Sequence, residues 1–188
     1  MNRRTALLAA CLALGPVAFA GSAQAAVISH EQIHSLYTWE EFFAAADGRE
    51  FPVQIRGNPF AMPAGDFERA VLARLQARNL GPRTTWIGSP DAAPAGRRLV
   101  LAFGVGSQLG TALCGGLAQL GAPATPSSSV TVAAAYCLGD RPLTEAYART
   151  TASGPEDRAF DSLLAELLPV VFPRRPGIRF ERDNFWKN

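Results

Sequence analysis

The sequence predicts an α+β fold, in which an antiparallel or mixed sheet of about five strands carries helices on one face. Residues 130–151 hold two extended runs, rich in β-branched and aromatic residues, on either side of the turn-forming Gly139-Asp140-Arg141-Pro142. Residues 99–105 form a nearly continuous apolar run, which is typical of a central strand. Segments near both ends of the chain show apolar stripes at helical spacing instead. The predicted element order is α-β-α-β-β-β-β-α.

The first predicted helix spans residues 28–46. Its apolar stripe comes from Ile33, Leu36 and Tyr37, which recur at spacings of three and four residues. Asp47-Gly48 supplies the stop signal at its end, because glycine readily adopts the conformation that terminates a helix.

Alternating residues then predict a strand over residues 51–56, which ends at a Gly-Asn-Pro turn. A second helix runs from Asp66 to about Asn79, since Asp is a favoured first cap and Gly81-Pro82 prevents continuation. A short strand over residues 84–87 follows, and the apolar strand over residues 99–105 comes next.

Residues 106–129 are unusual because they hold five glycines, two prolines and three consecutive serines. A connection of this length inside a compact domain is often functional. The hairpin follows it, and residues 154–168 then predict a last helix, with Pro155 in its first turn and Pro169 at its end. The remaining residues 174–188 form a tail rich in arginine and aromatic residues.

The N-terminus has the organisation of an export signal, and we assign residues 1–25 to a signal peptide. Arg3 and Arg4 precede an apolar stretch, and Ala23-Gln24-Ala25 is a cleavage site of the A-x-A type. Cleavage there leaves a single domain over residues 26–173, plus the tail, in the periplasm or outside the cell. Two alternatives remain open. Leu8-Ala9-Ala10-Cys11 resembles the lipobox of outer-membrane lipoproteins, and the paired arginines are equally compatible with twin-arginine and general export.

Charge and composition exclude two classes of protein for the mature chain. The full sequence has 18 Lys and Arg against 16 Asp and Glu, and two of the basic residues lie in the signal peptide, so the mature chain is neutral. A nucleic-acid-binding protein needs a net basic surface, so this class is not expected. No apolar run after the signal peptide reaches the roughly 20 residues of a transmembrane helix.

Two cysteines, Cys114 and Cys137, remain after removal of the signal peptide. An even number of cysteines in an oxidising compartment predicts a disulfide between them. The alternative is a pair of buried free thiols. Two cysteines without neighbouring histidines do not form a zinc site.

One catalytic motif is present, since His30-Glu31-Gln32-Ile33-His34 matches H-E-x-x-H. Over these five residues the chain resembles zinc metalloproteases. The resemblance implies that His30 and His34 bind zinc on one helix face and that Glu31 is the general base. The alternative is an exposed N-terminal helix whose polar face carries these residues without a metal. The sequence offers no third histidine, and it marks neither Glu156 nor Glu166 as a further ligand.

In organisation the chain resembles small exported α+β proteins of the Gram-negative envelope. The features that carry this resemblance are the leader, the F-P-V-Q-I-R-G-N-P-F strand and turn, and the cysteine-bearing hairpin. It implies a compartment and a type of fold, without an activity or a cofactor. We therefore expect a non-catalytic protein that binds or assembles with another envelope component. The partner is an envelope protein or, through the basic tail, an anionic lipid surface. The alternative is a zinc-dependent hydrolase.

Overall fold

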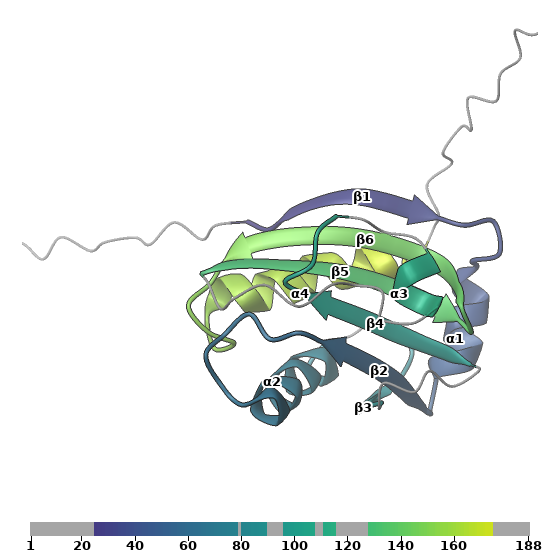
Figure 1. Ribbon diagram of the computed structural model, residues 1–188. Coiled ribbons are helices and arrows are strands. Elements are labelled where there is room, and N and C mark those ends of the chain that lie inside the picture. Colours follow the sequence, from purple (N-terminus) through teal and green to yellow (C-terminus); the bar gives the residue numbers. More distant parts are fainter. Residues whose placement is uncertain (1–24, 79, 90–95, 108–110, 116–127, 175–188) are drawn as a thin grey trace, which may run out of the picture.

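The computed structural model describes residues 25–78, 80–89, 96–107, 111–115 and 128–174. These residues form a six-stranded mixed sheet with helices packed on it, which confirms the α+β class (Figure 1). The strands are β1 (Val27–Ile33), β2 (Glu50–Arg56), β3 (Thr85–Gly88), β4 (Arg97–Phe103), β5 (Ser129–Leu138) and β6 (Arg141–Thr151). The helices are α1 (Trp39–Ala46), α2 (Ala64–Gln76), α3 (Thr111–Gly115) and α4 (Arg158–Val171).

The strand order is β1-β6-β5-β4-β2-β3. The predicted hairpin is present as β5 and β6, which pair antiparallel along their whole length, with Gly139 at φ +58° in the turn. Strand β4 joins β5 antiparallel, whereas β2 runs parallel to both β4 and β3. Strand β1 pairs antiparallel with β6 and forms one edge of the sheet.

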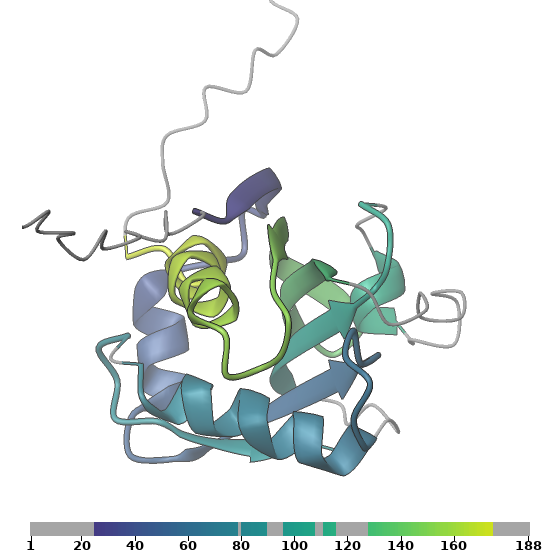
Figure 2. The same cartoon turned by 90° about the vertical axis from the view of Figure 1, so that its left-hand side faces the viewer.

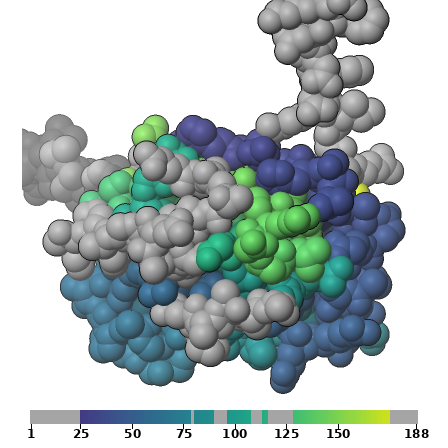
Figure 3. Space-filling view, turned by 45° about the vertical axis from the view of Figure 1, so that its right-hand side comes forward, coloured from purple at the N-terminus to yellow at the C-terminus, as the bar shows by residue number. Residues whose placement is uncertain are grey.

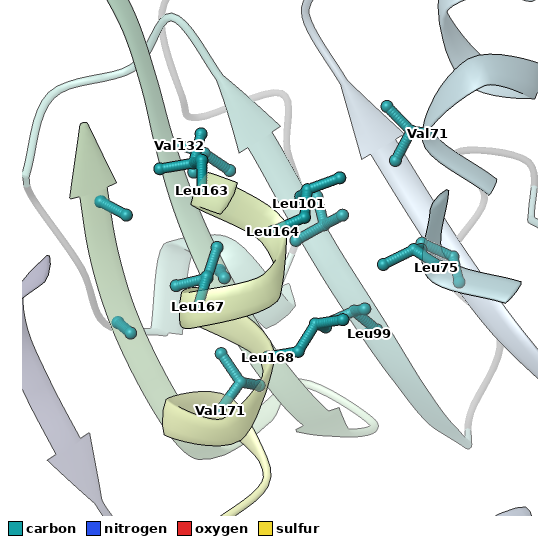
Figure 4. Packing of buried hydrophobic residues seen from close by; sticks show 14 of the residues in the cluster. Val71, Leu75, Leu99, Leu101, Val132, Leu163, Leu164, Leu167, Leu168 and Val171 are labelled. Atoms are coloured by element: carbon teal, nitrogen blue, oxygen red, sulfur yellow. The ribbon is translucent and has the colours of Figure 1, made fainter. Parts of the chain in front are cut away.

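Helices α1, α2 and α4 cover one face of the sheet, as the side view in Figure 2 shows. Alternate residues of each strand point toward them, as the pleat of a strand requires. Figure 4 shows the leucines of α4 meeting the side chains of Leu99, Leu101 and Val132 from β4 and β5. At one end of this layer Phe42 of α1 stacks on Phe172, with ring centroids 4.0 Å apart.

Helix α3 lies on the opposite face, which we call the outer face. The side chains of Leu113 and Cys114 are buried there against β4 and β5. Their neighbours on the sheet are small or apolar residues, namely Val100, Ala102, Ala133, Ala135 and Cys137. The prediction placed helices on one face only and contained no helix in the Gly-rich segment, so α3 is an addition to it.

The predicted helix over residues 28–46 is wrong in its first half, which forms strand β1. Ile28 and Ile33 both pack against the main core from this strand. The helix starts at Trp39, because Thr38 adopts an extended backbone and its hydroxyl accepts a hydrogen bond from the Glu41 amide at 3.2 Å. Tertiary contacts of the two isoleucines therefore outweigh the helical spacing of the sequence.

The last helix, α4, begins and ends later than predicted. Asp157 is its N-cap, and its side chain accepts from the amide of Ala159 at 2.9 Å. The helix continues past Pro169 to Val171. Proline removes one backbone hydrogen bond there, but Leu168 and Val171 are fully buried and hold the last turn on the sheet.

Two predicted regions lie almost wholly outside the described residues: the signal peptide over residues 1–25 and the tail over residues 174–188. Within the Gly-rich segment, residues 108–110 and 116–127 lie outside them as well. In the described ranges, no helix combines the length and the hydrophobicity that crossing a bilayer requires.

Candidate functional site

His30 to Ile33 of the H-E-x-x-H motif lie on strand β1 and His34 follows it directly, so the helical setting expected for them is wrong. His30 and Glu31 form a β-bulge opposite β6, and His30 has a positive φ of 53°. On a helix, residues four apart are separated by a rise of about 6 Å. On a strand the rise over four residues is about 13 Å, which the bulge shortens only in part. The strand therefore does not bring the two imidazoles onto one ion as a metalloprotease helix does.

The two histidines have different partners. His30 is exposed, and its Nδ1 lies 3.1 Å from the hydroxyl of the adjacent Ser29. His34 is about one-third exposed, and its Nε2 lies 3.2 Å from Oε2 of Glu145 on β6. The Glu145 side chain is only 1% exposed. The histidine therefore shields a buried carboxylate and ties the end of β1 to the hairpin.

Among the described residues, no group of three or more histidine, cysteine, aspartate or glutamate side chains is arranged to hold a metal ion. The two acids considered as third ligands lie elsewhere in the fold. Glu156 precedes α4 and pairs with Arg74 of α2 at 2.9 Å, and Glu166 is exposed on α4 itself. Catalytic zinc sites have three protein ligands, so this part of the chain does not supply a complete set.

The predicted disulfide between Cys114 and Cys137 is present. It joins α3 to the end of β5, with the two Cα atoms 5.6 Å apart and both residues buried. The alternative of two free thiols is therefore wrong. The bridge fixes a point within the Gly-rich segment to the outer face of the sheet.

Arg98 of β4 also holds Cys114 in place, through a hydrogen bond to its backbone carbonyl. It is 1% exposed, and its guanidinium donates to Gln54 Oε1 at 3.2 Å, to the Gly139 carbonyl at 2.8 Å and to the Cys114 carbonyl at 2.5 Å. Burial lowers the pKa of this guanidinium from its ordinary value. Three neutral oxygens thus bind a buried cation, and one of them belongs to α3.

The outer face therefore carries a row of mostly buried groups that runs across the sheet from β2 to the residue that follows β1. It consists of Gln54, Arg98, the disulfide, Glu145 and His34. Figure 3, turned toward the hairpin end, shows the light-green surface around β6 beside the purple surface of the N-terminal strand. In the described residues, the hydrogen bonds of Arg98 and the disulfide connect β2, β4, β5 and α3 within this row.

Sequence reasoning missed Arg98, Gln54 and Glu145. A signal for two of them was present. Arg98 precedes Val100 and Ala102 on one alternation of β4, and Glu145 lies in the middle of β6. A charged residue in the interior of a strand that is covered on both faces must be paired or hydrogen-bonded.

No family model matches this chain, and no curated protein or solved structure matches it at a significant level.

Proposed function

We propose that this chain is an exported, non-catalytic protein that binds or assembles with another component of the Gram-negative envelope. The buried disulfide supports export, because such bridges form and persist in oxidising compartments. The single observation that carries the binding role is the double attachment of α3 to the outer face, by the disulfide and by Arg98.

This attachment gives the Gly-rich segment a rigid base. The segment begins after Val105, whose carbonyl accepts from Thr131 Oγ1 at 3.3 Å, and it passes through α3 before it enters β5. Binding residues are often carried on connections that a rigid scaffold positions. A connection that served only to join β4 to β5 would need a few residues, whereas residues 106–129 form a much longer connection that the disulfide fastens covalently at Cys114.

Site-specific photo-cross-linking in the native host tests the proposal. The probe residue replaces Gly115, the exposed last residue of α3, where a side chain would meet no atom within 4 Å. Gly154 is the matched control, because a side chain there also meets no atom within 4 Å and it precedes α4. We expect one envelope protein to be captured from Gly115 and not from Gly154. Capture of nothing, or of the same mixture from both sites, would contradict a partner on this face.

A zinc-dependent hydrolase is the second candidate, with His30 and His34 as ligands and Glu31 as base. The observation that favours it is the contact of His34 with Glu145, since metal-binding histidines commonly have a carboxylate partner. Elemental analysis separates the two candidates. The binding proposal expects well under one equivalent of zinc in the purified protein. Stoichiometric zinc that is lost in His34→Ala would reverse their order.

A further inference from the structure

The two edges of the sheet are finished differently. At the β3 edge, the side-chain amide of Gln76 from α2 takes the place of a further strand. Its Nε2 donates to the Thr84 carbonyl at 2.9 Å, and its Oε1 accepts from the Trp86 amide at 3.0 Å. Exposed edge groups are a template for pairing with another chain, and this edge is covered.

Among the described residues, the β1 edge has no such cover. In the described ranges, no side chain or loop bonds to the backbone of Val27–Ile33 on the side away from β6. None of its seven residues is buried, and Val27 is 50% exposed. As far as the described residues extend, this edge is therefore open to another strand.

The bulge gives β1 an unusual symmetry. In a regular strand, Ile28 and Ile33 would point to opposite faces, because they are five positions apart. The extra residue at His30-Glu31 brings both onto the helix-covered face, where both pack on the core. Ser29 and Gln32 pair with Tyr147 and Glu145 of β6. These two residues of β6 alternate with Ala146 and Ala148, which face the core, so Ser29 and Gln32 lie on the outer face. Read from either end of Ile28–Ile33, the side chains therefore point first to the helix-covered face and then to the outer face, on both sides of the bulge.

The side chains follow the same symmetry. Around a centre between His30 and Glu31, the polar Ser29 matches Gln32 and the apolar Ile28 matches Ile33. The central residues themselves form a pair of basic and acidic character. A strand with this pattern is complementary to an antiparallel copy of itself.

We propose that two copies of this chain associate edge to edge through β1, around a two-fold axis between His30 and Glu31. The two strands run antiparallel, so that each Ile28 faces the second copy's Ile33 and each His30 faces the second copy's Glu31. The two sheets become one continuous sheet, and the long helices of both copies lie on the same side of it. This assembly leaves α3 and the outer face free, so it goes beyond the proposed function and does not depend on it.

Bulges and charges on an edge strand often prevent association, but here both fit the pairing. A histidine lies against a glutamate across the axis, and each copy contributes both bulge residues, so neither strand has an excess residue. One pair of short strands buries less than the roughly 1,200–2,000 Å² of stable interfaces. We therefore expect a reversible dimer that forms as the concentration rises through the micromolar range.

Sedimentation velocity on the mature chain tests this with two substitutions. Each one alone disrupts the pairing of residues 30 and 31 across the axis, and a mixture of the two variants restores it. Glu31→Lys places a lysine against the second copy's His30, and His30→Asp places an aspartate against the second copy's Glu31. Aspartate is used because it tolerates the positive φ of this position. Each variant alone should dimerise about tenfold or more weakly than the wild type. A mixture of the two should recover the dimer, since one central pair is then a lysine against an aspartate and the other is a histidine against a glutamate, as in the wild type.

Asp140→Lys is the control, because it makes the same charge change at an exposed residue of the β5–β6 turn and should leave the dimer unchanged. A wild-type chain that sediments as a monomer throughout the micromolar range would overturn the proposal. So would a dimer that both single variants retain, or one that the mixture fails to recover. A monomer that is still cross-linked from Gly115 to an envelope partner would overturn the dimer alone and leave the proposed function standing.

Discussion

Arg98 Nη2 donates to the carbonyl oxygen of Cys114 at 2.5 Å, so a buried cation of β4 holds the same short helix that the disulfide holds. The covalent bond limits how far α3 can move, and the hydrogen bond fixes its last turn. Removing the two attachments should have different effects. The disulfide stabilises mainly by restricting the unfolded chain, whereas the hydrogen bond stabilises the folded state.

Arg98→Met should lower the free energy of unfolding by about 3 kcal/mol, since it removes the donor of three hydrogen bonds to buried or partly buried oxygens. The oxygens belong to Gln54, Gly139 and Cys114. Chemical denaturation measures the loss. The control is Arg149→Met, the same substitution at an exposed residue of β6, which should change stability by less than about 0.5 kcal/mol. Equal losses in both variants would show that the buried contacts contribute nothing specific.

Removal of the disulfide by the double substitution of Cys114 and Cys137 to Ala should lower Tm by roughly 6–12 °C. The bridge closes a loop of 23 residues, which corresponds to about 3 kcal/mol in the chain-entropy model. Alanine is chosen because it introduces no hydroxyl at these buried sites. Alkylation of the native wild type without reductant should label neither cysteine. Two labelled thiols would show that the bridge does not form in the protein as purified.

His34→Ala should destabilise the fold by about 1 kcal/mol, because it removes a partner of the buried Glu145 carboxylate. This differs from the expectation for an exposed helix, on which the substitution would be nearly neutral. The matched control is His30→Asn, which keeps a residue type that tolerates positive φ. The control should be neutral within about 0.5 kcal/mol. If the two variants are equally stable, the contact between His34 and Glu145 carries no net stability.

The hairpin, the disulfide and most of the sheet could be predicted from sequence because their signals are local. Gly139-Asp140 marks a turn between two runs of strand-forming residues, and the two cysteines that follow the predicted signal peptide have one possible pairing. The first strand could not be predicted in the same way. Its bulge places Ile28 and Ile33 on one face at a spacing of five, which matches neither a regular strand nor a helix. Thr38-Trp39-Glu40-Glu41 did carry a capping signal for the true start of α1.

The polar row of the outer face depends on contacts between distant segments. Arg98 meets Cys114 and Gly139 only after β4, β5 and α3 have assembled, and Glu145 meets His34 across 111 residues of sequence. Charged residues are usually exposed, so composition alone places both on the surface. Their burial can be inferred only once β4 and β6 are known to be covered on both faces of the sheet.

The N-cap of α4 makes stability depend on pH. Hydrogen bonds from the Ala159 amide and from Ser153 hold the pKa of Asp157 below its ordinary value of 3.8. The unfolded chain binds the proton more readily, so this carboxylate stabilises the fold above pH 3.8 and loses its effect as the pH falls through the lower, folded-state pKa. Asp157→Asn should therefore reduce the loss of stability on acidification below pH 3.8. Thermal unfolding of both proteins across the acid range measures this, and parallel curves would contradict it.

Processing of the N-terminus should leave Ala26 as the first residue, because small residues occupy the cleavage site before it. The fold suits this boundary, since β1 starts at Val27 and Ala26 packs against the core. N-terminal sequencing of protein from the periplasm checks the boundary, and intact mass checks the absence of a lipid. Ala25→Arg is the matched variant, because a large charged residue at the cleavage position should leave the signal peptide attached. A lipid-modified Cys11 at the start of the chain would contradict the prediction and would tether β1 to a membrane.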